Sequence, residues 1–141
     1  MTATAAQTGY GATLGIGNGA TPPVYTVVAE VTALKGLKQS RDQIEATHLL
    51  SPGGYKEFIG GMKDFAALTA AINYVPGGAA ETALLAAFGT QANKPYQITF
   101  PGGGTWSFSG VMTEYAPGDL DPNKKMEASV TIKPSGGPAI A

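Results

Sequence analysis

The chain has 141 residues, enough for one domain that buries roughly two-thirds of its unfolded-state surface. It has no cysteine, which excludes disulfides and thiolate metal sites, and its formal charge of -1 argues against tight nucleic-acid binding, which needs a basic stripe. Charged residues make up only 13% of the chain, well below the roughly 25% of an ordinary soluble domain, and such a weakly charged surface tends to associate with other molecules.

The N-terminal segment, residues 1–23, is rich in Ala, Thr and Gly and closes with two prolines. This composition predicts an irregular arm. The arm carries no Lys or Arg ahead of an apolar stretch, so neither a secretory signal nor a membrane span is expected. Two strands should follow, because residues 24–34 (VYTVVAEVTAL) and residues 41–49 (RDQIEATHL) alternate apolar and polar side chains.

The second half of the chain contains signals for both strands and one helix. Residues 67–75 (ALTAAINYV) have the period of a strand, and residues 79–88 (AAETALLAAF) place apolar side chains on one helical stripe that ends before Gly89. The segments PGGG and PGDLDPN are typical of hairpin turns between strands. The remaining predicted strands cover residues 96–100, 105–115 and 125–132.

Together, the six predicted strands and one amphipathic helix indicate a mainly β fold, a β-sandwich or open barrel with the helix packed on its flank. The domain should span residues 24–133. A second Gly/Pro-rich stretch, residues 134–141 (PSGGPAIA), should form a C-terminal tail, so that the compact body carries an arm at each end.

Residues 51–64 (SPGGYKEFIGGMKD) carry bulky apolar side chains in a segment that also holds two Gly-Gly pairs. The glycines predict a mobile or turning loop at the end of a strand, where side chains normally face water. Its apolar members therefore either fold back onto the chain's own core or form an exposed patch that binds another molecule. These members are Tyr55, Phe58, Ile59 and Met62.

Residues that could support catalysis or metal binding are sparse. His48 is the sole histidine, so one chain cannot form a His-based triad or a multi-His metal site, and a structural or interface role is expected. Asp42 and Glu45 are an acidic pair with no partner nucleophile or cleft. We therefore expect a protein that is not an enzyme and needs no cofactor.

Two motifs match binding sites only formally. GIGNGA satisfies G-x-G-x-x-A at Gly15, Gly17 and Ala20, but it follows no predicted strand and leads into two prolines, where a helix cannot continue. Asp119 and Asp121 lie in PGDLDPN, which lacks the glycine and the terminal glutamate of a calcium loop. Neither a dinucleotide nor a calcium ion is expected to bind.

Four stretches of the sequence together resemble the tail tube (major tail) protein of long-tailed bacteriophages, in order and at similar spacing, over residues 24–136. They are VYTVVAEVTAL, SRDQIEATHLLSPGGYKEFIGGMKD, YQITFPGGGTWSFSGVMTEY and MEASVTIKPSG, of which the SPGGYKEFI part is the most specific. The resemblance implies a β-sandwich with a flanking helix that assembles as hexameric rings stacked into a hollow tube.

The resemblance further implies a virion structural protein, assembled in the host cytoplasm, whose tube conducts double-stranded DNA into the host without binding it specifically. Implied partners are further copies of the chain, a tape measure protein, a tail terminator and distal tail proteins, and no membrane. Because Lys or Arg on the channel wall would retain the phosphate backbone, a neutral to acidic wall is expected. Candidate lumen residues are Glu30, Thr32, Glu114 and Thr131.

In this family the long loop between the second and third strands reaches neighbouring subunits, and the matching residues here are 40–64. The resemblance implies that its apolar side chains anchor in a neighbour's groove inside a polar rim, while both terminal arms order on assembly. The implied interface residues are Tyr55, Lys56, Glu57, Phe58, Ile59, Met62, Lys63 and Asp64.

Two alternatives stay open. A stand-alone β-sandwich module for glycans or peptides would use Trp106 and Tyr115 as a surface platform, although the alternation of Trp106 with Phe108 favours a place in the core. A secretion-system tube protein would share the structural role, but the SPGGYKEFI segment favours a phage.

Overall fold

The computed structural model describes residues 3–18, 24–28, 30–118 and 120–141. The described residues form strands, one α-helix and one short 3-10 turn, and the mainly β fold with a single flanking helix that the sequence predicts is confirmed. In chain order these elements are β1 (Thr13–Gly17), β2 (Tyr25–Val27), β3 (Val31–Lys35), β4 (Gln39–Glu45), η1 (Pro52–Gly54), β5 (Phe58–Phe65), β6 (Leu68–Asn73), α1 (Ala79–Phe88), β7 (Lys94–Thr99), β8 (Thr105–Pro117) and β9 (Glu127–Ile140).

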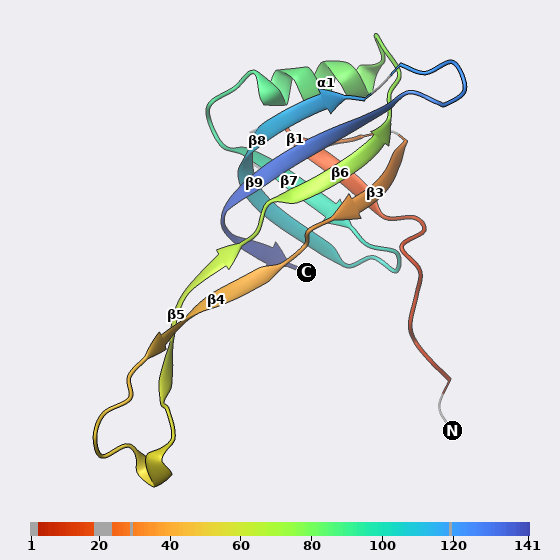
Figure 1. Ribbon diagram of the computed structural model, residues 1–141. Helices are drawn as coiled ribbons and strands as arrows, with labels where there is room; N and C mark the ends of the chain where they lie inside the picture. The colour runs from red at the N-terminus through yellow and green to blue at the C-terminus, as the bar shows by residue number, and fades with distance from the viewer. Residues whose placement is uncertain (1–2, 19–23, 29, 119) are drawn as a thin grey trace.

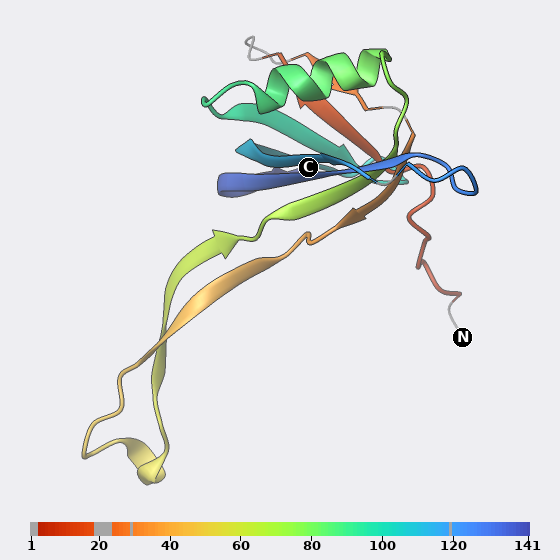
Figure 2. The ribbon, with the colours of Figure 1, turned by 45° about the horizontal axis from the view of Figure 1, so that its top comes forward.

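The body of the protein is one seven-stranded antiparallel sheet in the order β2-β1-β7-β8-β9-β6-β3. Figure 1 shows that this sheet is strongly twisted and that α1 lies along one side of it. Strands β4 and β5 form a separate two-stranded sheet, which Figure 1 and Figure 2 show projecting away from the body. The fold is therefore a compact body with one long hairpin.

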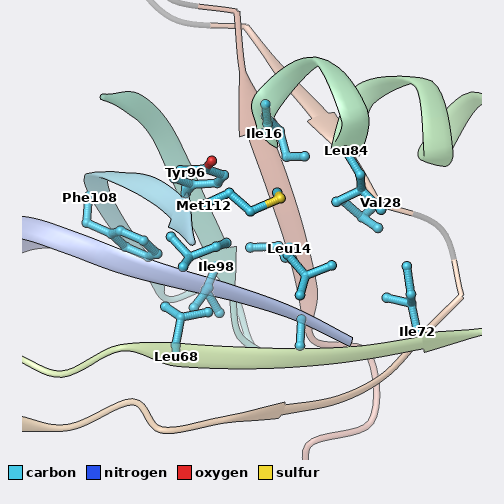
Figure 3. Packing of buried hydrophobic residues seen from close by; sticks show 14 of the residues in the cluster. Leu14, Ile16, Val28, Leu68, Ile72, Leu84, Tyr96, Ile98, Phe108 and Met112 are labelled. Carbon is cyan, nitrogen blue, oxygen red and sulfur yellow. The ribbon is translucent and has the colours of Figure 1, made fainter. Parts of the chain in front are cut away.

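The core lies on the sheet face that α1 covers, because alternate residues of each strand point to the same face. On β6 and β9 the register sets three buried pairs directly opposite one another. Figure 3 shows Leu84 reaching from α1 toward the sheet side chains of this cluster. The opposed pairs are Leu68 with Ile132, Ala70 with Val130, and Ile72 with Ala128.

Strand β1 is a difference from the sequence prediction, which places residues 1–23 in an irregular arm. Residues Thr13–Gly17 instead pair with both β2 and β7, and Leu14 and Ile16 are core residues. Of the rest of the expected arm, residues 3–11 are exposed and outside the sheet, while residues 19–23 lie outside the part of the chain that the structure describes.

Close packing explains why β1 is hard to recognise. The residues that alternate with its two apolar side chains are Thr13, Gly15 and Gly17, so the second row of the strand has only one side chain. A Cβ at Gly15 would lie 3.0 Å from Cβ of Tyr25, and one at Gly17 would collide with Pro95. Glycine is therefore required here by neighbouring strands, although in a sequence it usually indicates a turn.

The other predicted elements are present with shifted ends. The strand expected over residues 24–34 is divided into β2 and β3, which lie at opposite ends of the sheet, with Glu30 at a φ of 59° between them. The tail expected from residue 134 belongs to β9 as far as Ile140, which pairs with Trp106. Among the described residues, no helix is long and apolar enough to cross a membrane.

Three buried side-chain polar atoms of the described residues have no hydrogen-bond partner, namely Oδ1 of Asn73 and the hydroxyls of Tyr96 and Tyr115. Tyr96 is fully buried, its hydroxyl has no hydrogen-bond partner, and burial raises the pKa of Tyr96 to about 12. Since an unfolded tyrosine ionises near pH 10, the unfolded chain loses this proton between pH 10 and 12 while the folded chain keeps it. The free energy of unfolding should therefore fall by about 1.4 kcal/mol per pH unit in this window because of Tyr96 alone.

Tyr96→Phe should remove this loss, so the variant gains stability relative to the parent between pH 10 and 12. At pH 8 it should be as stable or more so, because a buried hydroxyl without a partner is removed. Urea unfolding at pH 8, 10 and 11.5 measures the difference, with Tyr55→Phe, a change at an exposed tyrosine, as the control. An equal pH dependence in parent and Tyr96→Phe would contradict the prediction.

Candidate functional site

The hairpin formed by β4 and β5 is the most unusual surface of the molecule. Every residue of β4 is exposed, and on β5 only the last residue, Phe65, is buried. A two-stranded ribbon is at best marginally stable in water when nothing packs against it. This hairpin therefore lacks, within one copy of the chain, the cover that would stabilise it.

The apolar side chains predicted to lie in this segment are all exposed. Phe58 is 48% exposed and Met62 82%, and Tyr55 and Ile59 are exposed as well. None of the four folds back onto the chain's own core. Ile44 joins them, since it lies directly opposite Ile59 across the two strands.

Both faces of the ribbon carry apolar groups. The opposed Ile44 and Ile59 lie on one face, and Phe58, opposed to Glu45, lies on the other because neighbouring residues of a strand point to opposite sides. A single flat contact would cover only one of these faces. Complete burial of the hairpin requires contacts on both sides.

The two Gly-Gly pairs differ in their roles. Gly53 and Gly54 have positive φ angles in the turn at the tip, as the prediction of a turning segment requires. Gly60 and Gly61 lie inside β5 rather than at the end of a loop. A Cβ at Gly60 would lie 2.9 Å from Cδ of Arg41, whose Nη1 donates a hydrogen bond to the Gly61 carbonyl at 3.1 Å. The second pair thus accommodates an arginine side chain across the ribbon.

The tip of the hairpin, residues 46–57, is held by hydrogen bonds centred on Glu57. Its Oε2 accepts a hydrogen bond from the Ser51 hydroxyl at 2.7 Å and lies 3.3 Å from Nε2 of His48. The Glu57 N–H donates to Oγ1 of Thr47 at 2.9 Å. Nδ1 of His48 accepts the Leu50 N–H at 3.1 Å, which fits the neutral imidazole with its proton on Nε2. His48 and Glu57 therefore fix the shape of the tip.

Two residues that the sequence analysis passed over are the most exposed leucines of the described chain. Leu49 is fully exposed and Leu50 is 86% exposed, and both lie in the turn that precedes Ser51. The signal was available in the sequence. The two consecutive leucines come where the predicted strand ends, directly before a Ser-Pro-Gly-Gly turn, so no following element could bury them.

The root of the hairpin is fixed to the body. The buried ring of Phe65 contacts the rings of Trp106 and Phe108, with centroids 5.9 and 5.3 Å away. Nζ of Lys133 on β9 lies 3.1 Å from Oδ1 of Asp64 and donates to the Phe65 carbonyl at 2.8 Å. Asp64 therefore lies at the root and not at the tip, while Lys56 and Lys63 are exposed along the hairpin.

The candidate lumen residues lie on the body. Glu114 and Thr131 are directly opposed on β8 and β9, on the sheet face opposite the core. Thr32 lies on the end strand β3 and donates to the Ala71 carbonyl at 3.1 Å, and Glu30 is exposed in the connection before it. The structure brings only Glu114 and Thr131 together, and their place on a channel wall stays a prediction.

The other candidate sites are not assembled in the described residues. Trp106 packs edge-on against Phe100, 6.0 Å between centroids, and is partly buried against the core, so it forms no flat surface platform. The described part of the chain has no group of three or more His, Asp or Glu side chains that could hold a metal ion. Ala20 of the dinucleotide-like motif and Asp119 of the calcium-like turn lie outside the described residues.

Comparisons with known proteins agree in sequence and in fold. Residues 10–141 match the family model described as "Lambda phage tail tube protein, TTP". A chain of the native gene transfer agent virion has a TM-score of 0.78 at 15% identity, covering 96% of this chain and 99% of that one. A chain from the tail of an empty gene transfer agent particle, refined with C6 symmetry, has a TM-score of 0.77 at 17% identity. This match covers 96% of this chain and 99% of that one.

A third similar chain comes from the sheath/tube terminator of an extracellular contractile injection system, PVC, in its extended state. It has a TM-score of 0.73 at 14% identity and covers 99% of both chains. No curated protein sequence matches this chain. At these identities the structural likenesses concern the fold, and the family is carried by the sequence match over residues 10–141.

The root contacts predict a difference between two lysines. Lys133→Met keeps the aliphatic stem but removes the ion pair and the hydrogen bond to the Phe65 carbonyl, so it should lower the free energy of unfolding by about 1 kcal/mol. Lys125→Met is the matched control, because Lys125 pairs with Glu127 at 3.5 Å on an exposed surface, and it should change stability by less than about 0.5 kcal/mol. Urea unfolding at neutral pH measures the free energy of unfolding of both variants. Equal losses of stability would contradict the prediction that Lys133 fixes the root of the hairpin to the body.

Proposed function

Because the chain belongs to the lambda phage tail tube protein family, we propose that its copies polymerise as stacked hexameric rings to form the tail tube of a long-tailed phage or phage-like particle. Members of this family are structural proteins of virion tails and not enzymes, and the same holds for this chain. The finer steps are proposals: the tube assembles in the host cytoplasm around a tape measure protein, is closed by a tail terminator, joins distal tail proteins and conducts DNA into the host.

The observation that carries this proposal is the projecting hairpin. Its exposed apolar side chains on two faces need cover, and in a homopolymer the cover comes from neighbouring copies. Such a contact joins different surfaces of the two copies, so it repeats from copy to copy and produces rings or filaments. The gene transfer agent tail, one chain of which has a similar fold, was refined with C6 symmetry, and this supports six copies in each ring.

The sheet edges support the same assembly. β2 and β3 end the seven-stranded sheet, and an unpaired edge invites pairing with another strand. One subunit has too few strands to enclose a channel for DNA, since even a 16-stranded barrel has only a porin-sized pore. Pooling the sheets of several copies closes the edges and widens the channel. Residues 3–11 of the N-terminal segment, which are exposed in one copy, would order against neighbours.

The channel wall is proposed to be the sheet face opposite the core. Glu114 and Thr131 lie there, and the near-neutral chain offers no excess of cations that would hold DNA. Neutral and acidic groups would let a phosphate backbone pass. The tape measure protein would occupy the same channel before DNA does.

A second candidate is the tube of a contractile injection system. It is favoured by the fold likeness to chains of such systems, including one from a sheath-tube complex with a TM-score of 0.66 at 17% identity. The sequence match to the phage family favours the phage tail tube.

Phe58→Ala should block tube growth and leave a folded protein, because Phe58 is exposed in the single copy and buried only between copies. Full burial of such a side chain contributes about 1.5–3 kcal/mol, and Phe58 is 48% exposed in the single copy, so about half of this is gained on assembly and the concentration needed for tubes should rise severalfold. Electron microscopy of a concentration series measures this. Phe88→Ala, which truncates a phenylalanine of similar exposure on α1 (45% against 48%), is the control and should still form tubes. Normal tubes from Phe58→Ala would refute the anchor role.

A further inference from the structure

The tip of the hairpin is an apolar projection whose turn is ordered by local hydrogen bonds. Leu49 and Leu50 extend from a turn that is held by the hydrogen bonds of His48, Ser51 and Glu57. These bonds order the tip before any partner arrives, so little conformational freedom is left to lose on binding. The tip is therefore shaped for insertion and not for wrapping around a partner.

The body carries an apolar hollow of about 810 Å³, which we name the seam groove. All five residues of the end strand β3 line it, and residues 7–12 of the N-terminal segment line it as well. A hollow of this size is within the range of about 300–1,000 Å³ that encloses drug-sized ligands. Its apolar lining includes Val31, Leu34, Leu37, Ile98 and Phe100.

The tip cannot enter the seam groove of its own chain. Leu37 lines the groove and lies only two residues before β4 begins, so the groove is close to the root of the hairpin. At about 3.3 Å per residue, the seven residues of β4 alone hold the tip more than about 20 Å from that root. The contacts of Phe65 and Lys133 fix the root, and both views show the hairpin directed away from the body (Figure 1, Figure 2).

The charges of the two surfaces are complementary. The distal part of the hairpin, residues 42–59, carries Asp42, Glu45 and Glu57 against the single cation Lys56. The lining of the seam groove carries one charged side chain, Lys35. An acidic projection with apolar side chains at its end thus matches an apolar groove with a cationic rim.

We propose that Leu49 and Leu50 of one copy seat in the seam groove of a second copy, with the groove's Lys35 beside the acidic distal part of the hairpin. The inference rests on the proposed function and specifies which surface receives the hairpin. The hairpin tip and the seam groove lie on different parts of the molecule. Each copy can therefore insert its tip into one neighbour and receive the tip of another, and the contact repeats from copy to copy.

Charge substitutions at the tip test how much Leu49 and Leu50 contribute to the free energy of assembly. Leu49→Asp combined with Leu50→Asp should raise the concentration needed for assembly at least tenfold, with unchanged stability of the single copy, because both side chains are already exposed. Leu120→Asp is the matched control, since Leu120 is a 78% exposed leucine in the connection between β8 and β9, and it should leave assembly unchanged. Equal effects of tip and control changes would overturn the proposal.

Disulfide trapping tests the geometry. The chain has no cysteine, so Leu50→Cys with Lys35→Cys introduces only the two thiols that the contact brings together. The protein is concentrated, imaged by electron microscopy, oxidised and run on a denaturing gel without reductant. We expect tubes and a ladder of covalent multimers, whereas Leu50→Cys with Leu120→Cys should give tubes without a ladder.

The outcomes separate the two proposals. Tubes without a ladder, or an equal ladder from the control pair, would overturn the seam groove and leave the tube function standing. A ladder without tubes would support the groove contact and overturn the tube function. Neither tubes nor a ladder, at any concentration up to the solubility limit, would overturn both.

Discussion

The constraint on which the structure depends is the burial of apolar side chains on the β4–β5 hairpin, which a single copy leaves exposed. A ribbon of two strands has too little apolar contact to be stable alone, and here it carries exposed apolar residues on both faces and two leucines at its end. Such a surface is costly in water unless another molecule covers it. The chain therefore has a folded body with its own core and an extension for which we propose a neighbouring copy as the cover.

The body serves to hold this extension in one direction. Phe65 belongs at once to the last position of the hairpin and to the aromatic cluster of the core, so the ribbon cannot rotate without disturbing the core. Lys133 adds an ion pair and a hydrogen bond from β9 at the same point. The Glu57 contacts order the far end. An extension with an ordered root and tip loses less conformational entropy on docking than an unstructured loop would, so more of its burial contributes to assembly.

Sequence reasoning succeeded where side chains alternate regularly. The strand at β6, the helix at α1 and the long exposed segment between strands were all predictable, because their apolar periods are undisturbed. It failed where glycine has a packing role. In β1 glycines make room for Tyr25 and Pro95, and in β5 they accommodate Arg41, yet a sequence gives the same signal for a turn. In β9 the run Gly136-Gly137-Pro138 lies where the register with β8 shifts, so the strand continues beyond residues that usually end one.

The site was predictable in its segment but not in its geometry. That Tyr55 and Phe58 are exposed together follows from their place between turns, whereas the root position of Asp64 and the groove beside β3 depend on contacts between residues far apart in the chain. Such contacts leave no local pattern. The exposed Leu49 and Leu50 are the exception, since their position before a turn was visible and went unused.

The central claim is that the hairpin, residues 39–65, is uncovered in one copy and covered by other copies. Amide hydrogen exchange of the same protein below and above its assembly concentration measures this segment by segment. Our account predicts that peptides from residues 39–65 exchange quickly in the dilute protein and become strongly protected after assembly, while peptides from β6 and β9 are protected in both. Unchanged exchange of the hairpin in assembled protein would contradict it.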